Sequence, residues 1–445
     1  MAPSTPRRRL LLLLPDGRIH KLSLGPLRTS FREAPLTATH LAALVPPELD
    51  LDISVVDGSI SPPPLEEDYD LVAISVITGT APEAYRLAEH FRRRGATVVL
   101  GGVHVTLLPD EAAAHADAIV VGPAEDTWPK LLHDWHDGRM AERYQPERRP
   151  SLAGLPEPRR DLQKHLGYIM PNTVFATRGC GHRCDFCAVP AAGIGWQTRP
   201  VGDVVSSVRA TGARRIAFND VNIVQDRDYA IELFEAMAPL GKKWGGLATT
   251  DVAHDPELLE AMVRSGCSYL LLGFESVSNH GLRDMRKSFN HPGGYRFVCD
   301  TLHRHGIAIQ GCFIFGLDDD DPSVFDDTIE AVNELRIDIP RYALYTPFPG
   351  TAAYRRLEAD GRLLHRDWWY YDTQHVVIQP LKLSPEQLER GFFHAWRKTF
   401  TMRSILHRTS ACPRQLPISF VGNLAYRLYI RRLERDTRRF PAQGA

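Results

Sequence analysis

The sequence predicts an α/β chain in three parts, and three observations support this fold class. Between residues 10 and 140, nearly continuous apolar runs alternate with helical patterns, which is typical of a parallel sheet covered on both faces. From residue 174 to 346, strand and helix patterns repeat about six times, which indicates a partial (β/α)6 TIM barrel. After residue 361 only helical patterns remain. We therefore expect an α/β domain over 1–140, a linker over 141–172, a partial barrel over 173–360 and a helical segment over 361–445.

The first strand of the α/β domain is expected at the leucine run Leu10–Leu14, which follows three arginines. Basic residues before an apolar run resemble a signal peptide, but a signal peptide needs about 7–15 apolar residues and this run is shorter. No stretch approaches the ~20 apolar residues of a transmembrane helix. We therefore expect a buried strand here and no integral membrane segment.

The other elements of this domain follow in strict alternation. Helices are expected at Ala38–Leu44, Pro82–Arg94, Glu111–Ala114 and Trp128–Trp135, and strands at Leu51–Val56, Leu71–Ile77, Thr97–Leu100 and Ala118–Val121. Ligands of such sheets bind beyond the carboxyl ends of the strands. Small and polar residues gather in those turns, namely Ser75, Thr78, Gly101, Gly102, His104, Thr106 and Gly122. These residues form either ordinary strand-to-helix turns or a ligand-binding site in which the glycines let the backbone approach the ligand closely.

The linker is expected because residues 140–160 are rich in proline, arginine and glutamate and have no apolar period. In the barrel that follows, strands are expected at Val174–Thr177, Ala217-Phe218, Trp244–Thr249, Tyr269–Phe274, Ala308–Phe315 and Tyr342–Thr346. Helices are expected between them, at Val201–Ala210, Tyr229–Met237, Pro256–Ser265, Gly293–His305 and Pro322–Leu335. Two further helices are expected in the last segment, at Pro385–Phe400 and Val421–Arg435.

The most informative motif is the run TRGCGHRCDFC, in which Cys180, Cys184 and Cys187 form a C-x3-C-x2-C triplet. Three thiolates on one loop can hold three irons of a four-iron cluster and leave the fourth iron without a protein ligand. A cluster with four protein ligands mainly carries electrons, whereas an open iron can bind and reduce a small molecule. A zinc site is the alternative, but zinc prefers four ligands, usually as paired C-x2-C units.

The triplet resembles the signature of radical SAM enzymes, and the resemblance spans roughly residues 170–360. It implies a [4Fe-4S] cluster whose open iron is chelated by S-adenosylmethionine, which is cleaved to a 5′-deoxyadenosyl radical. By the same resemblance, the residues near S-adenosylmethionine are Phe186, Asn219, Asp220, Asn222, Glu275, Ser276 and Gly316. For Phe186 the alternative is core packing, and for Asn219 to Asn222 a helix cap. Asp319 to Asp321 are expected to form a solvated turn.

The first domain resembles the cobalamin-binding domain of B12-dependent radical SAM proteins, which is Rossmann-like (flavodoxin-like). The run GGVHVTLLPDE matches the family's GG-x-H-x-T-x-x-P-x-E loop, and VVGPAED matches its VVG-x-x-E turn. The seven turn residues from Ser75 to Gly122 are thereby implied to bind cobalamin. A D-x-H-x-x-G segment is missing from the sequence, so the usual motif offers no histidine as lower axial ligand. A degenerate domain without cofactor is the alternative.

Together the two resemblances imply a cobalamin-dependent radical SAM methyltransferase that methylates an unactivated carbon of a small molecule, lipid or natural product. Alternatives are a radical SAM enzyme that performs cyclisation, rearrangement or carbon–carbon coupling, and an iron–sulfur carrier or sensor without catalysis. The implied partners are a small-molecule substrate and an electron donor such as flavodoxin or ferredoxin.

The charge and the cysteine content of the chain indicate its class of partner and its cellular compartment. The 53 basic and 54 acidic residues nearly cancel, so no nucleic-acid surface built on bulk charge is expected. The four cysteines outside the triplet (Cys267, Cys299, Cys312 and Cys412) are expected to be buried thiols in a reducing compartment, the cytoplasm. The last helix carries many arginines; a membrane-surface role is conceivable, but docking on its own domain is favoured.

Overall fold

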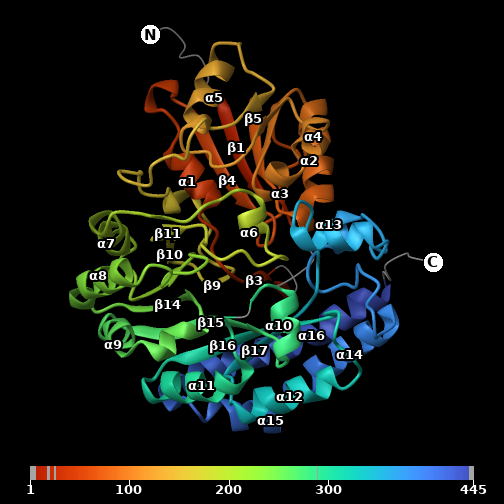
Figure 1. The fold of residues 1–445 in the computed structure, drawn as a ribbon. Helices are drawn as coiled ribbons and strands as arrows, with labels where there is room; N and C mark the ends of the chain where they lie inside the picture. The colour runs from red at the N-terminus through yellow and green to blue at the C-terminus, as the bar shows by residue number, and fades with distance from the viewer. Residues whose placement is uncertain (1–6, 18–20, 25–26, 288, 440–445) are drawn as a thin grey trace. The chain divides into compact units, whose positions relative to one another are not determined.

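The computed structural model describes residues 7–17, 21–24, 27–287 and 289–439 and divides into two compact units (Figure 1). Unit 1 contains the chain up to residue 173 together with 191–194. Unit 2 contains 174–190 and 195 onward.

The centre of unit 1 is a six-stranded sheet whose paired strands run parallel, as the apolar runs predict. Its spatial order is β4 (Asp52–Asp57), β1 (Arg9–Leu14), β5 (Leu71–Ser75), β6 (Thr97–Gly101), β7 (Ala118–Val120) and β8 (Arg143–Tyr144). The strand order reverses at β1, which lies between β4 and β5. Such a switch point opens a ligand crevice at the carboxyl ends of the strands.

Helices cover both faces of this sheet. On one face, α1 (Thr37–Ala43) and α5 (Thr127–His136) pack on Leu10, Leu12 and Leu71 in one core cluster. On the other, α2 (Ala81–Arg93) contacts β5 and β6 through its buried apolar stripe. The short helices α3 (Val103–Leu107) and α4 (Pro109–Ala113) follow β6 directly. The alternation therefore gives the predicted doubly wound, flavodoxin-like arrangement.

Two parts of unit 1 differ from the expectation. Residues 141–172 are not merely an extended connection, because β8 joins the edge of the main sheet. A second sheet combines β2 (Lys21–Leu24), β3 (Leu27–Glu33) and β9 (Tyr168–Met170). These strands are short and have no long apolar run. Pairing between segments that are distant in sequence stabilises these strands, so a local sequence pattern does not predict them.

Unit 2 is built on an open six-stranded sheet, which confirms the partial barrel. Its order is β10 (Thr173–Val174), β13 (Arg215–Phe218), β14 (Lys243–Ala248), β15 (Cys267–Glu275), β16 (Ala308–Phe315) and β17 (Ile339–Leu344). The connecting helices are α7 (Val201–Ala210), α8 (Arg227–Met237), α9 (Pro256–Arg264), α10 (Asn279–Asp284), α11 (Tyr295–Arg304) and α12 (Val324–Glu334). A two-stranded ribbon, β11 (Thr177–Arg178) with β12 (Gln197–Thr198), and the short α6 (Ala188–Ala191) flank the cysteine loop.

Four helices complete unit 2: α13 (Ala352–Ala359), α14 (Pro385–Thr399), α15 (Met402–Thr409) and α16 (Leu416–Arg439). The sequence predicts α14 and α16 but neither of the eight-residue helices. Arg408 of α15 is fully buried and joins these parts. Its guanidinium donates hydrogen bonds to the carbonyls of Ile337, Asp338 and Thr399, at 2.8–3.0 Å, and to Oδ1 of Asn423 on α16 at 3.0 Å.

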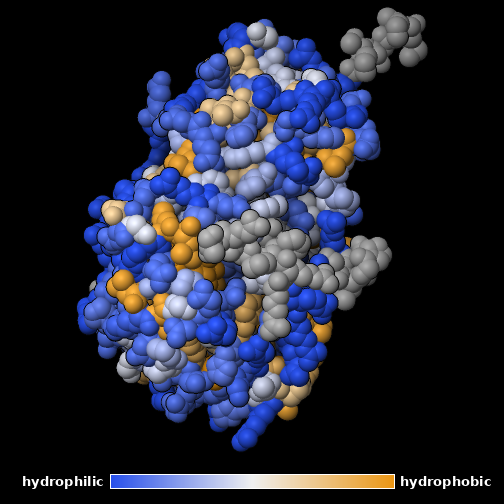
Figure 2. All heavy atoms as spheres, turned by 90° about the vertical axis from the view of Figure 1, so that its right-hand side faces the viewer, coloured by the Kyte–Doolittle hydropathy of each residue, from blue (hydrophilic) through white to orange (hydrophobic). Residues whose placement is uncertain are grey.

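All seven cysteines are free thiols, and Cys267, Cys299 and Cys412 are buried, as expected, while Cys312 is half-buried. The face shown in Figure 2 is mainly hydrophilic, with separate apolar patches. Among the described residues, no helix combines the length and the apolarity that crossing a bilayer requires.

Candidate active site

The cysteine triplet lies where the sequence predicts, on the loop that leaves the first strand of the barrel. Cys180, Cys184 and Cys187 fall between β11 and α6, and all three are half-buried. Within the described part of the chain, no three His, Cys, Asp or Glu side chains converge as ligands of a single metal ion.

A buried carboxylate fixes the backbone from which this loop begins. Asp220 follows β13 and is 2% exposed. It accepts hydrogen bonds from the N–H of Ala176, at 3.0 Å, and from the N–H and hydroxyl of Thr177. Burial raises the pKa of Asp220 to about 6, against the lowering effect of these donors. Because its oxygens are occupied, Asp220 positions the cysteine loop, and the expected contact with S-adenosylmethionine stays a prediction.

Gln225, which the sequence analysis does not single out, supports the loop a few residues further on. Its Oε1 accepts from Gly181 N–H at 3.1 Å and from the Cys180 thiol at 3.6 Å. Asn222 donates to the same oxygen at 3.3 Å. The predicted residue Asn222 therefore lies beside the cysteine loop, and its neighbour Asn219 donates its backbone N–H to the carbonyl of Val174.

The far side of the loop is anchored by α13. Asp185, between the second and third cysteines, is buried and lies 3.4 Å from the guanidinium of Arg356. The carbonyl of Asp185 also accepts from Ala353 N–H at 3.1 Å. Arg356 further contacts Asp318 at 2.7 Å, and so does Arg362 at 2.6 Å. This partly exposed ion-pair network therefore holds the loop between α13 and the turn after β16.

Glu275, predicted at the end of β15, is buried beside an ammonium group that the sequence analysis misses. Its carboxylate lies 2.5 Å from Nζ of Lys287, which also donates to the carbonyl of Gly273. Glu275 has a backbone φ of +63°, a left-handed conformation that is unusual for this residue type. Burial lowers the pKa of Lys287, but Glu275 and the nearby thiols raise it more, so the pKa is raised overall. Lys287 is therefore a buried cation.

That cation faces the thiols. Burial raises the pKa of Cys184 to about 11, while Lys287 acts in the opposite direction. Burial likewise raises the pKa of Cys187. Thiolates are the form that ligates iron, so these thiols need nearby positive charge, from Lys287 and from the metal itself, to lose their protons.

The remaining predicted residues of unit 2 serve partly as scaffold. Phe186 packs against a core cluster that contains Met285 and Tyr345, which agrees with the packing alternative. Ser276 is buried, and its hydroxyl accepts from Ser278 N–H at 3.0 Å. Gly316 has a φ of +98°, and its N–H donates to a carboxylate rather than pointing freely into the site.

That carboxylate belongs to Asp320, and it corrects the expectation of a solvated turn over Asp319 to Asp321. Asp320 is 4% exposed and accepts from the N–H groups of Gly316 and Leu317 at 2.8 and 3.0 Å. Burial raises its pKa to about 6. Only Asp319 and Asp321 are solvated, because the middle carboxylate is needed to satisfy the backbone of the tight turn.

In unit 1, the turns after β5, β6 and β7 are joined to one another by hydrogen bonds. Val76 N–H donates to Gly101 O at 2.8 Å. Thr106 Oγ1 accepts from Gly122 N–H at 2.9 Å and donates to Gly102 O at 3.0 Å. The structure thus brings the seven predicted residues together at the carboxyl ends of three neighbouring strands.

Gly102 is the tightest point of this cradle. Its φ is +99°, and a Cβ there would lie 2.7 Å from both N and O of Val76. Any other residue would separate the turn after β6 from the turn after β5. Glycine is therefore required here for a close approach of two backbones.

His104 is fully buried in a polar network instead of being presented to a ligand. Its ring nitrogens lie 3.3 Å from Oγ1 of Thr78 and 3.1 Å from the hydroxyl of Tyr85. Tyr85 in turn donates to Glu111 at 2.9 Å. His104 therefore fixes the turn that carries Thr78, and Tyr85 and Glu111 are supporting residues that the motif alone does not reveal.

Comparison with known proteins now identifies the family. A family model described as B12 binding domain matches residues 19–132, and one described as Radical SAM superfamily matches residues 174–340. The bacteriochlorophyllide d C-12(1)-methyltransferase of Chlorobaculum tepidum is 34% identical over 358 residues, which cover 78% of each chain. The chain belongs to the cobalamin-dependent radical SAM methyltransferases. The enzyme therefore uses a [4Fe-4S] cluster, S-adenosylmethionine and cobalamin.

Two further comparisons agree with this family. The bacteriochlorophyllide d C-8(2)-methyltransferase of the same organism is 28% identical to the enzyme over 383 residues, 82% of this chain and 84% of the relative. The solved structure of TsrM from Kitasatospora setae, with cobalamin and a [4Fe-4S] cluster bound, superposes with a TM-score of 0.63. That alignment covers 87% of this chain and 82% of TsrM at 16% identity, which shows a shared fold.

The residues present fit the cofactors of the family. Three half-buried thiols with a facing ammonium suit an anionic cluster that keeps one iron open. In unit 1, the turns after three neighbouring strands bring backbone and small side chains to the carboxyl ends of the sheet, where a ligand of such a sheet binds. Both ring nitrogens of His104 are hydrogen-bonded within the protein, so this motif offers no imidazole as an axial ligand of cobalamin.

The first prediction concerns the cysteine loop. Cys184→Ala removes one of three iron ligands, so 5′-deoxyadenosine formation by the anaerobically reconstituted enzyme should fall to background. Cys299→Ala changes a buried thiol on α11, outside the loop, and is the matched control. Chromatography of the products measures both. Retention of 5′-deoxyadenosine in Cys184→Ala would contradict the assigned ligand set.

The second prediction concerns the cobalamin cradle. Gly102→Ala should lower cobalamin affinity at least about tenfold, because the new methyl group forces the two turns apart. Gly95→Ala is the control, since Gly95 has a similar φ of +90° but nothing within 4 Å of an added Cβ. Corrinoid absorbance after gel filtration gives the bound amount. Equal cobalamin content in the two variants would show that the cradle does not hold the corrin.

The third prediction concerns Asp220. Asp220→Ala leaves the N–H groups of Ala176 and Thr177 unpaired, which should destabilise the enzyme by roughly 2–4 kcal/mol and reduce iron content. Asp228→Ala removes an exposed carboxylate in the first turn of α8 and should change neither quantity appreciably. Urea unfolding and iron per chain are the measurements. If both variants matched the wild type, Asp220 would have no positioning role.

Proposed function

We propose that the enzyme methylates an unactivated side-chain carbon of a large apolar ring compound, with a bacteriochlorophyllide-type tetrapyrrole as the first candidate. The observation that carries this proposal is the 34% identity to the C-12(1)-methyltransferase over 78% of both chains. The second relative, of similar length, also acts on a bacteriochlorophyllide.

We assign the residues of unit 2 to two kinds of role. Cys180, Cys184 and Cys187 hold the cluster, and Lys287 offsets its negative charge. Asp220 and Gly316 position the surrounding backbone, as their hydrogen bonds suggest. Contacts with S-adenosylmethionine are assigned to the residues Phe186, Asn219, Asn222, Glu275 and Ser276.

In unit 1, we assign the corrin to the cradle formed by Ser75, Thr78, Gly101, Gly102, Thr106 and Gly122, with His104 holding Thr78 in place. When bound, the cofactors supply the reducing electron, the hydrogen-abstracting radical and the methyl group. The chain's own task is to orient these groups and to exclude water.

A low-potential cluster needs an external one-electron donor, and we propose a flavodoxin or ferredoxin for this role. Seven free cysteines and an oxygen-sensitive cluster suit the reducing cytoplasm.

The test is an anaerobic assay with a bacteriochlorophyllide substrate and methyl-deuterated S-adenosylmethionine. We expect the deuterated methyl group to appear in the product, together with 5′-deoxyadenosine and S-adenosylhomocysteine in equal amounts, as followed by mass spectrometry. Substrate consumption without gain of label would instead indicate cyclisation or rearrangement. No turnover of tetrapyrroles, with cleavage of S-adenosylmethionine intact, would reject the substrate class but not the radical chemistry.

A further inference from the structure

The last helical segment of unit 2 has a strongly unequal charge. Residues 401–435 contain seven arginines and only one acidic residue, Glu434, whereas the whole chain has 53 basic and 54 acidic residues. Glu434 is already paired with Arg397 on α14 at 2.6 Å. Arg408 is fully buried, but the other six arginines are exposed or half-buried, so this segment forms a local basic surface.

One side of α16 within this segment is docked, as expected. Ser419, Asn423, Tyr426, Ile430 and Leu433 recur at three- and four-residue intervals and are buried. At 100° per residue, these positions share one face of the helix. Asn423 on this face donates to the carbonyl of Asp338, which ties α16 to the barrel.

The opposite side of α16 carries solvent-exposed apolar residues. Ile418, Val421 and Leu428 are 45%, 65% and 52% exposed. The spacing of three and seven residues places them along a single outward stripe, which continues toward Arg435 in the last turns. A helix that only covers its own domain would have polar residues here, so the apolar stripe indicates a further apolar environment.

Helix α15, which packs beside α16, repeats this pattern. Met402 and Leu406 are 39% and 56% exposed and lie one turn apart, while Ile405 and Arg408 face inward. The hydrogen bond from Arg408 to Asn423 joins the two helices. We call the exposed residues Met402, Leu406, Ile418, Val421 and Leu428 the apolar ridge.

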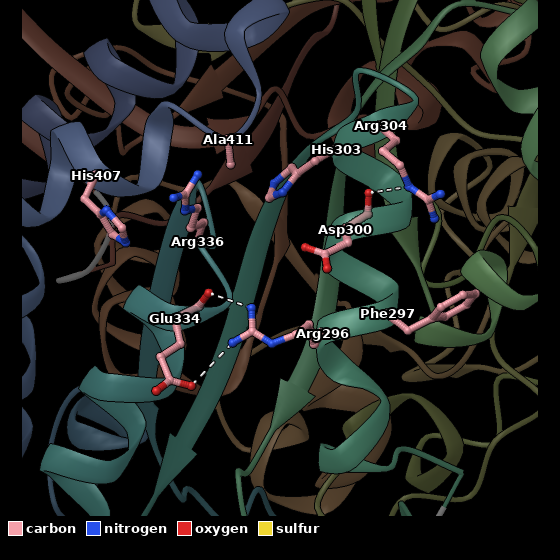
Figure 3. Close-up of a pocket in the computed structure, with 9 residues that line it drawn as sticks. All are labelled: Arg296, Phe297, Asp300, His303, Arg304, Glu334, Arg336, His407 and Ala411. Carbon is pink, nitrogen blue, oxygen red and sulfur yellow. Dashed lines mark hydrogen bonds and ion pairs between the residues drawn. The ribbon is translucent and has the colours of Figure 1, made fainter.

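A basic hollow of about 870 Å³ runs along α11 beside the carboxyl ends of α12 and α15, next to the ridge residue Leu406 (Figure 3). His407, the neighbour of Leu406, lines it together with Arg304 and Arg336, which Figure 3 labels. Two acids also line it; Glu334 is paired with Arg296, and Asp300 lies on α11. Among the described residues, no carboxylate pairs with Arg336. Helix carboxyl ends favour cations, which helps to explain why basic residues gather here.

We propose that the apolar ridge and the basic hollow dock the enzyme on an anionic lipid bilayer. Exposed aliphatic side chains beside arginines match the boundary between acyl chains and negatively charged headgroups. A second copy of this surface would place arginine against arginine, and nucleic acid offers nothing for Ile418, Val421 and Leu428. The proposal is independent of the substrate, although apolar substrates are concentrated in bilayers.

The test is co-sedimentation of the purified full-length enzyme with vesicles of phosphatidylcholine alone or mixed with phosphatidylglycerol. We expect binding to the mixed vesicles, weak binding to phosphatidylcholine alone, and loss of binding in high salt because the charges are screened. Val421→Glu with Leu428→Glu should lower partitioning at least about tenfold. Arg431→Gln with Arg435→Gln should lower it roughly tenfold on the mixed vesicles only.

The matched control is Leu381→Glu, because Leu381 is 62% exposed but lies before α14, outside the basic segment. It should bind vesicles like the wild type. Far-ultraviolet circular dichroism and iron content establish that the variants fold, and S-adenosylmethionine cleavage tests the proposed function separately. Failure of the wild type to bind mixed vesicles at low salt would overturn the proposal. So would a dimer, seen by analytical ultracentrifugation, that Val421→Glu dissociates while vesicle binding is absent.

Discussion

The Asp220 carboxylate is the interaction on which the cluster site depends. It receives the backbone of Ala176 and Thr177 in a buried environment, and the cysteine loop starts directly after them. A loop that must leave one iron open cannot rely on a fourth ligand for its shape. Its shape comes instead from the acceptors Asp220 and Gln225 on one side and from the ion pair of Asp185 with the donor Arg356 on the other. Leaving the buried backbone N–H groups of Ala176 and Thr177 unpaired would cost free energy, so Asp220 holds the start of the loop in place.

In unit 1, too, hydrogen bonds fix the backbone of the candidate site: the turns after β5, β6 and β7 are bonded to one another. Thr106 joins the turns after β6 and β7, and His104 joins the turn after β6 to Thr78. Polar residues that a motif search assigns to ligand contact thus act largely by positioning backbone. Preorganised turns reduce the ordering that binding requires, which favours affinity for a large rigid macrocycle.

Local patterns predict the apolar strands of the two main sheets, most helices and the cysteine triplet, because each depends on residues close in sequence; they miss the short strands β2, β3, β8 and β9. They miss contacts made by folding. Lys287 reaches Glu275 only because α10 returns the chain to the end of β15, and Tyr85 meets His104 across two helices. Asp320 lies in a run of aspartates that is typical of a solvated turn, yet its carboxylate accepts hydrogen bonds from the N–H groups of Gly316 and Leu317. Burial of that kind is set by the tertiary fold and not by the run of charges.

The most direct test of the whole account is electron paramagnetic resonance of the reduced enzyme with and without S-adenosylmethionine labelled with ¹⁵N and ¹⁷O in its amino and carboxylate groups. A three-cysteine site with a vacant iron predicts a changed cluster signal with hyperfine coupling to both labels. A cluster signal that ignores the labelled compound, or a protein that holds zinc in place of iron, would contradict it.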